Sequence, residues 1–236
     1  MNIKRMPATI AAILWVIFPT LAGAQASDAP SAVKFSCVVW KELPYPGIFY
    51  RQKEKFLPLA LPARQRSEMY PLEGQEALEL YTAKDQPDGK PGYELVGKAT
   101  LPQGSKQFLF MIQESPDGSK LPLRIFGMDD SLDAFPAGTF RFLNFTSLPL
   151  QVDFGGSTHK LPPEAIKVVL PAIPELGGFL PFIIKDADGH IGFQTRLFGQ
   201  PRGRKMVMIV PPSKQAEKLS VLFVPQIVPY PPEPDR

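Results

Sequence analysis

With 44% hydrophobic residues, this 236-residue chain is long enough to bury a substantial core, and its formal net charge is only +3. That charge gives no support for binding to nucleic acid or to an anionic membrane. The single cysteine excludes an intramolecular disulfide, so the core has to stabilise the fold. The 28 prolines and 18 glycines divide the chain into short segments, which argues against long helices.

The first 24 residues have the pattern of a secretory signal peptide. Lys4 and Arg5 precede the apolar run 8–18, and residues 22–24 (Ala-Gly-Ala) are the small residues that a signal peptidase accepts. The run is about half as long as the ~20 residues that a membrane-spanning helix needs. We therefore expect cleavage after Ala24, a periplasmic or secreted product, and no transmembrane segment in the rest of the chain.

Beyond residue 24, alternation of apolar and polar residues predicts an all-β fold. Most of the alternating segments end at Gly, Pro or Asp-Gly, which favour tight turns. The expected strands are 33–40, 47–51, 55–60, 76–82, 93–100, 106–113, 121–127, 138–145, 149–154, 158–160, 165–170, 179–185, 190–198, 203–210 and 219–224.

The first expected strand contains the only cysteine and leads into a tryptophan. Cys37 alternates with Phe35 and Val39, which predicts a buried and unreactive thiol. Trp40 falls on the opposite face, where we expect it to pack between sheets or domains. The alternative is an exposed ring that stacks on a sugar, so Trp40 is the one possible binding residue that the sequence offers.

The chain contains what looks like an internal repeat. Residues 93–125 align with 191–223 without a gap, so that Phe110 falls on Met208. A period near 100 residues is too long for a solenoid and matches the size of one β-sandwich domain.

The alignment extends upstream with a different offset. There, Phe35 falls on Phe140 and Phe56 falls on Leu161. A true duplication would place all of these pairs at equivalent positions of the same strands, whereas a chance alignment of alternating residues would not.

The predicted fold is therefore two tandem, internally similar β-sandwich domains of the immunoglobulin-like type. We expect the domains to span 33–128 and 134–227, with a linker at 129–133 and a proline-rich tail at 228–236.

Two runs, 108–112 and 206–210, are apolar at every position. This pattern predicts central strands that are covered on both faces.

Metal and cofactor chemistry find little support. The two histidines, His159 and His190, have no zinc-binding spacing around them. Residues 186–189 (Asp-Ala-Asp-Gly) are similar to the start of a calcium loop, but no glutamate closes the loop and a hairpin turn is the better interpretation. We predict no metal site and no cofactor.

Catalytic motifs are equally weak. Residues 157–160 (Ser-Thr-His-Lys) match the serine-x-x-lysine tetrad of penicillin-binding enzymes, but they lie between expected strands and the accompanying motifs are absent. The sequon 144–146 lies inside an expected strand, so we assign it no function. Two small basic clusters, Arg64 with Arg66 and Arg202 with Arg204 and Lys205, are expected in solvated turns. We predict no catalytic residue.

The block 134–146 (AFPAGTFRFLNFT), followed by Phe154-Gly-Gly and Leu161-Pro-Pro, resembles uncharacterised exported β-rich proteins of environmental bacteria for which no activity is known. In size, export signal and paired sandwich plan, the chain also resembles periplasmic pilus chaperones in architecture.

These observations predict an exported, non-enzymatic protein with a structural or protein-binding role in the cell envelope. A carbohydrate-binding module that uses Trp40 is the first alternative, and an envelope hydrolase is the second.

Overall fold

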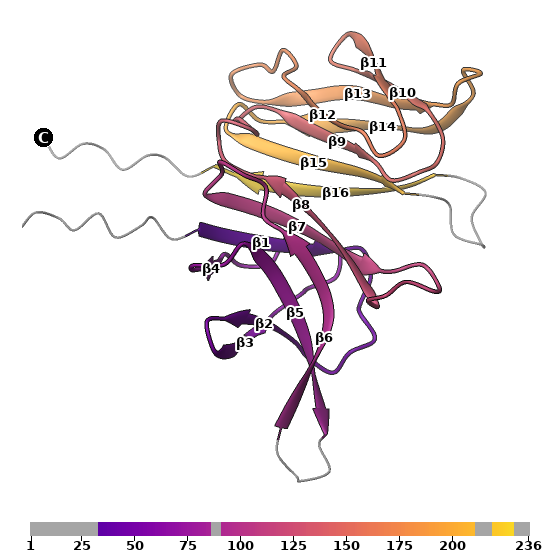
Figure 1. The fold of residues 1–236 in the computed structure, drawn as a ribbon. Helices are drawn as coiled ribbons and strands as arrows, with labels where there is room; N and C mark the ends of the chain where they lie inside the picture. The colour runs from indigo at the N-terminus through magenta and orange to yellow at the C-terminus, as the bar shows by residue number, and fades with distance from the viewer. Residues whose placement is uncertain (1–32, 86–90, 211–218, 229–236) are drawn as a thin grey trace, which may run out of the picture. The chain divides into compact units, whose positions relative to one another are not determined.

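The computed structural model describes residues 33–85, 91–210 and 219–228, which form an all-β structure (Figure 1). The expected signal peptide 1–24 and the tail beyond residue 228 lie outside the described residues. Among the described residues there is no helix that is long and apolar enough to cross a membrane.

The strands of the first half form one sheet in the order β3-β2-β5-β6-β8-β7-β1-β4. Their bounds are β1 (Val33–Val39), β2 (Ile48–Gln52), β3 (Lys55–Leu59), β4 (Tyr70–Leu72), β5 (Ala77–Asp85), β6 (Pro91–Thr100), β7 (Gln107–Glu114) and β8 (Leu123–Asp129). The sequence pattern missed β4, because it has only three residues and Pro71 at its centre. Proline is tolerated there because β4 is an edge strand.

The strands of the second half form two sheets, in the orders β11-β10-β13-β14 and β12-β9-β15-β16. Their bounds are β9 (Phe140–Asn144), β10 (Leu150–Phe154), β11 (Ser157–Leu161), β12 (Ile166–Val169), β13 (Gly178–Lys185), β14 (Ile191–Gly199), β15 (Gly203–Val210) and β16 (Ser220–Ile227). Every strand expected from the sequence overlaps one of the observed strands.

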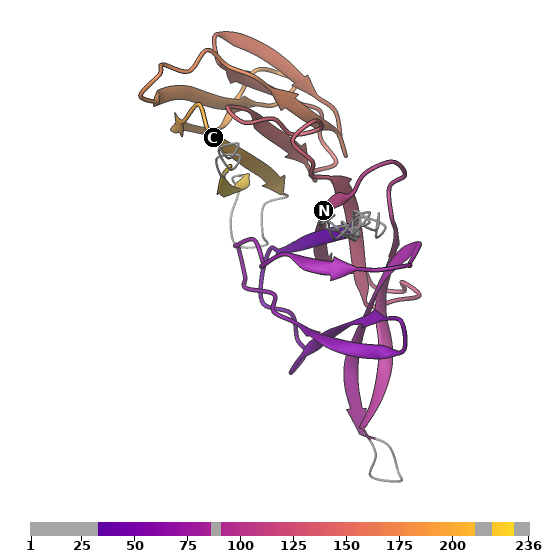
Figure 2. The same ribbon diagram turned by 90° about the vertical axis from the view of Figure 1, so that its left-hand side faces the viewer.

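The two halves repeat one strand order. Their strands are labelled in Figure 1, and Figure 2 shows the same ribbon turned by 90°. If β1–β8 are matched in turn with β9–β16, each neighbouring pair of the second half has its counterpart in the first. The parallel pair β1 and β7 matches β9 and β15, and the antiparallel pair β1 and β4 matches β9 and β12. The strand order expected of a duplication is therefore observed.

The halves differ at the seam between their sixth and eighth strands. In the first half, Gly97 on β6 pairs with Leu123 on β8 and makes the sheet continuous. A Cβ atom at Gly97 would lie 2.9 Å from Cδ1 of Ile125, so this close approach depends on the missing side chain. In the second half, β14 and β16 belong to separate sheets.

The sequence alignment of the seventh strands was wrong by one residue. Cys37 pairs with Phe110 in the first half, and Phe142, its expected equivalent, pairs with Val207. Phe110 therefore matches Val207, and both side chains face the cores of their own halves, whereas Met208 faces the other side of its sheet. A slip of one residue exchanges the faces of a strand, and apolar residues on both faces hide the slip from the sequence.

The alignment of the third strands was also wrong. In both halves, a two-residue turn joins the second strand to the third, at 53–54 and at 155–156. Phe56 therefore matches Thr158, which is likewise the second residue of its strand, and not Leu161. Loops of unequal length between the repeats caused this error.

Each half encloses its own apolar core. In the first half, the core consists of Phe35, Cys37, Val39, Ile48, Tyr50, Leu59, Leu72, Leu78, Leu80, Val96, Phe108, Phe110, Ile112 and Leu123. In the second half, the two sheets pack face to face through aromatic rings. Phe142 stacks on Phe182, with ring centroids 5.6 Å apart, and meets Phe154 edge-on at 5.3 Å.

A third apolar cluster, which we call the junction core, joins the two halves. It contains Val38, Leu109, Met111 and Met128 from the first half, and Leu143, Met206, Met208, Leu222 and Val224 from the second. Met111 and Met208 are equivalent residues, as are Val38 and Leu143, so the halves meet through the same face. The prediction that the runs 108–112 and 206–210 are covered on both faces is confirmed for 108–112 and 206–209, whereas Val210 is only partly buried.

A buried charge cluster lies where the first half leads into the second. Asp130 follows β8 and is fully buried, and its carboxylate lies 2.5 Å from Arg66 and 3.0 Å from Arg204. Nη1 of Arg141 lies 3.8 Å from the same carboxylate. The guanidinium groups of Arg141 and Arg204 also lie 4.2 and 4.8 Å from the ring of Phe135.

This cluster corrects the expectation that Arg66 and Arg204 lie in solvated turns. Arg204 is 3% exposed, and its guanidinium donates to backbone carbonyls as well as to Asp130. Burial lowers the pKa of Arg141 to about 10, against the opposing effect of Asp130. The sequence could not show this cluster because Asp130 lies 64 residues from Arg66 and 74 from Arg204.

The immunoglobulin-like part of the predicted fold is not observed. In an immunoglobulin domain, the first strand pairs with the second, whereas here β1 pairs with β4 and β7. The broader expectation of an all-β fold of packed sheets is confirmed.

Candidate functional site

Trp40 directly follows β1 and packs, partly buried, against the junction core. Cys37 points into the core of the first half, so the prediction that the two side chains lie on opposite faces is confirmed. The guanidinium of Arg64 lies 5.7 Å from the centre of the Trp40 ring. A backbone hydrogen bond of 2.8 Å from Arg64 to Val39 holds Arg64 beside the tryptophan.

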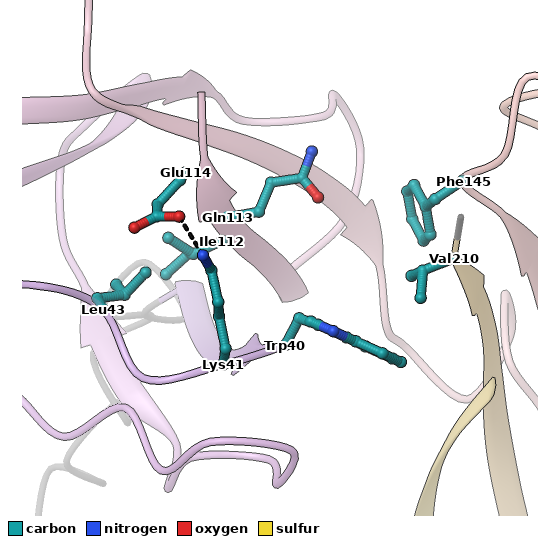
Figure 3. Close-up of a pocket in the computed structure, with 8 residues that line it drawn as sticks. All are labelled: Trp40, Lys41, Leu43, Ile112, Gln113, Glu114, Phe145 and Val210. Atoms are coloured by element: carbon teal, nitrogen blue, oxygen red, sulfur yellow. Dashed lines mark ion pairs between the residues drawn. The ribbon is translucent and has the colours of Figure 1, made fainter. Parts of the chain in front are cut away.

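A cavity of about 440 Å³ opens beside Trp40 (Figure 3). In the figure, the Trp40 side chain extends toward Phe145, which follows β9, and toward Val210 at the end of β15. The lining residues are Trp40, Lys41, Leu43, Ile112, Gln113, Glu114, Phe145 and Val210. Both halves of the chain therefore contribute to the cavity.

The two charged side chains of this cavity neutralise each other on its solvent-exposed side. Lys41 and Glu114 form an ion pair, and their side chains are 62% and 39% exposed. The remaining wall is apolar except for Gln113. The cavity thus has an apolar wall and a charged rim.

A second cavity of about 390 Å³ shares Gln113 and Phe145 with the first. Its lining residues are Gln113, Arg124, Ile125, Phe126, Gly127, Met128, Phe145, Glu164, Ala165 and Ile166. Arg124 covers the ring of Phe126 at 4.2 Å and lies 3.6 Å from Glu164. We call the two cavities together the junction groove.

Phe145 is held between the two cavities by the loop after β9. The amide of Asn144 is 1% exposed and donates to three backbone carbonyls, at 2.8 to 3.0 Å. Its oxygen accepts from the backbone and hydroxyl of Thr146. The sequon at 144–146 therefore fixes this loop, and the ring of Phe145 reaches within 5.7 Å of that of Phe126.

The remaining sequence candidates do not form a reactive site. Cys37 is fully buried, as predicted, and burial raises the pKa of its thiol. The tetrad 157–160 lies on strand β11 rather than at the start of a helix. Its His159 places Nε2 3.3 Å from the carbonyl of Phe154.

The segment 186–190 forms the hairpin turn that the sequence predicted. One carboxylate oxygen of Asp186 accepts from the backbone of Asp188 and of His190, at 2.9 Å each. The ligand atoms of Asp186, Asp188 and His190 lie within 4.8 Å of one another. The hydrogen bonds of the turn explain why these three side chains lie close together, and we assign no cofactor or metal to them.

The sequence identified only Trp40 among the residues of the junction groove. Phe145 was missed, although the alignment that matches Phe35 with Phe140 also matches Trp40 with Phe145. Each of these aromatic residues follows the first strand of its repeat. The repeat could therefore have indicated that two aromatic residues meet at the junction of the halves.

No known protein-family model matches this chain, and no curated protein sequence matches it. The function of this chain therefore has to be inferred from the geometry of the junction groove.

Proposed function

We propose that this chain is an exported, non-catalytic binding protein of the cell envelope, with two tandem β-sandwich domains at 33–128 and 134–227. In this proposal, the junction groove holds an apolar segment of a protein partner. The observation that carries it is the pair of cavities that meet at Phe145 and Gln113, with Trp40 in the wall of one of them.

The composition of the groove supports a protein partner. Energetically important residues of protein interfaces are often Trp, Tyr or Arg set in a pocket, with a polar rim that excludes water. Here Trp40 and Phe145 form the wall, while the Lys41–Glu114 pair and Arg124 form the rim. Cavities of about 400 Å³ are large enough to accept one or two apolar side chains.

The same groove offers little support for catalysis. Among the described residues that line it, no serine, threonine, cysteine or histidine is present. Its two carboxylates, Glu114 and Glu164, each lie beside a cation, Lys41 and Arg124. Neutralised carboxylates without a nucleophile suit binding better than general acid–base chemistry.

Sugar binding at Trp40 is less favoured by the geometry. A saccharide that stacks on tryptophan needs an open ring face. Arg64 lies over the Trp40 ring, and the indole turns toward apolar residues of the second half.

The binding proposal can be tested with a panel of fluorescently labelled ten-residue peptides that carry Leu or Phe at alternate positions. Fluorescence anisotropy should detect binding of some of these peptides to the wild-type protein. Trp40→Ala and Phe145→Ala should each weaken that binding tenfold or more, because truncation of a central aromatic residue removes buried contacts.

The matched control is Phe179→Ala, which removes an aromatic ring that is 62% exposed and does not line the groove. This variant should bind the peptides as the wild type does. Equal affinities for the wild type, Trp40→Ala and Phe179→Ala would contradict the proposal, as would an absence of binding by every peptide of the panel.

Export is a separate part of the proposal and rests on residues 1–24. Mass spectrometry of the protein from its native host should find Gln25 at the N-terminus, as expected for cleavage after Ala24. An extracytoplasmic product that retains Met1 would contradict this part.

A further inference from the structure

The first half carries an aromatic cluster on the outer face of strands β2, β3, β5 and β6, on the side opposite its core. Phe56 stacks on Tyr93, with ring centroids 4.0 Å apart and an angle of 12° between the planes. Tyr81 meets Phe56 edge-on at 4.8 Å, and Phe49 meets Tyr93 at 5.2 Å. All four rings are only partly buried, so the cluster reaches the solvent.

A network of polar side chains continues from this cluster along the same face. The hydroxyl of Tyr81 donates to Glu79 at 2.9 Å, and Lys98 donates to the other oxygen of that carboxylate at 2.8 Å. Nη1 of Arg51 lies 3.6 Å from Glu79. Tyr81 therefore links the aromatic cluster to a set of hydrogen-bonding groups.

These polar groups line a cavity of about 370 Å³. Its lining residues are Arg51, Lys53, Gly74, Gln75, Glu76, Ala77, Glu79 and Lys98. Carboxylate, amide and guanidinium groups in such a cavity can bind neighbouring hydroxyl groups of one ligand. The aromatic cluster beside it offers rings for the apolar C–H faces of the same ligand.

The second half shows that the fold does not require aromatic residues on this face. Residues equivalent to Phe49 and Phe56 are Gln151 and Thr158, at the same places relative to the turn between the second and third strands. Tyr81 and its equivalent, Lys185, both directly follow the register shift of the fifth strand. The second half thus carries polar side chains where the first half carries three rings.

We propose that this outer face of β2, β3, β5 and β6 binds an oligosaccharide. The rings of Phe56 and Tyr81 pack against the C–H face of a sugar unit, and Glu79 and Arg51 bind its hydroxyl groups. The site is separate from the junction groove, because the two share no lining residue.

Isothermal titration calorimetry with cellohexaose, chitohexaose, laminarihexaose and maltohexaose tests this proposal. The wild-type protein should bind at least one of the four. Phe56→Ala should weaken this binding tenfold or more. Tyr81→Phe should weaken it several-fold, because it keeps the ring and removes the hydroxyl that orients Glu79.

Thr158→Ala is the matched control, because it changes the equivalent position of the second half. It should leave binding unchanged. Since Phe56→Ala can also loosen the sheet, thermal unfolding is recorded for each variant, and Tyr81→Phe is the variant expected to keep the wild-type melting temperature. The proposal is overturned if none of the four saccharides binds, or if Phe56→Ala and Tyr81→Phe bind as tightly as the wild type.

Discussion

Residues 33–129 and 140–227 place their eight strands in the same order, yet the first half closes into one sheet and the second forms two. Because the strand order is the same, positions that are apolar in both halves are those that the fold requires, and positions that differ are those at which it accepts other side chains. Apolar residues recur at the core and junction positions of both halves. The outer faces differ, because the first half carries aromatic side chains at positions where the second half carries polar ones.

The halves also differ around Asp130. In the first half, Gln107 donates to this carboxylate and Ser36 accepts from Arg66, whereas the equivalent positions of the second half hold Arg204 and Arg141. Gln107 donates to the backbone carbonyl of Asp130 at 3.1 Å. The second half therefore supplies two of the three guanidinium groups that face the buried carboxylate, and the first half carries neutral side chains at the equivalent positions.

The largest expected effect comes from removing this carboxylate charge. Asp130→Asn should destabilise the protein by about 3–5 kcal/mol, because buried guanidinium groups then lose their counter-charge. Urea unfolding would measure the change. Asp133→Asn is the control, since Asp133 is exposed, and it should stay within about 0.5 kcal/mol of the wild type. Equal stabilities of the two variants would show that the cluster does not hold the halves together.

An unequal effect is expected at one pair of equivalent core positions: a loss as large as that of Asp130→Asn at Phe142, and a small loss at Cys37. Phe142→Ala should cost about 3–5 kcal/mol, because it removes the ring that contacts Phe154 and Phe182. Cys37→Ala should cost only about 1 kcal/mol, because the thiol is small. Denaturant unfolding of both variants checks this order. Equal losses would mean that the two positions are not filled as differently as the structure shows.

The smallest effects concern one carboxylate on each outer face. Hydrogen bonds from Lys98 and Tyr81 hold the pKa of Glu79 below its ordinary value of 4.5, and those from Lys185 and Thr158 hold the pKa of Asp153 below 3.8. A carboxylate whose pKa is lowered in the folded state stabilises the protein at pH values above its ordinary pKa. This stabilisation is lost as the pH falls through the pKa of the folded state.

Glu79→Gln and Asp153→Asn should therefore each cost about 0.2–1 kcal/mol at pH 7, the range for solvent-exposed ion pairs. The difference from the wild type should disappear as the pH falls below the ordinary values. Thermal unfolding measured from about pH 2 to about pH 7, the range in which these carboxylates titrate, would follow this difference in stability. A difference that grows toward low pH would contradict the assignment.

Alternation of apolar residues was sufficient to predict most of the strands, because a half-buried strand has a period of two. It could not set the register of β15 in the alignment of the two repeats. Both faces of this strand are apolar, so Val207 and Met208 fit equally well as the residue equivalent to Phe110. It also could not predict the charge cluster at Asp130 or the junction groove. Both bring together residues that are far apart in the chain, through pairings between distant strands. Trp40 was found because it is the single tryptophan after the expected signal peptide and lies beside a clear strand, while its equivalent, Phe145, is one of 17 phenylalanines.

The central claim is that the two halves are equivalent and meet through the same face, with Met111 matching Met208. Anomalous diffraction from selenomethionine-labelled protein tests it directly. The selenium atoms of Met111, Met128, Met206 and Met208 should form one cluster between the halves, apart from the exposed Met69. A selenium position for Met208 inside the aromatic core of the second half would contradict the claim, because it would place Met208 on the face that the structure assigns to Val207.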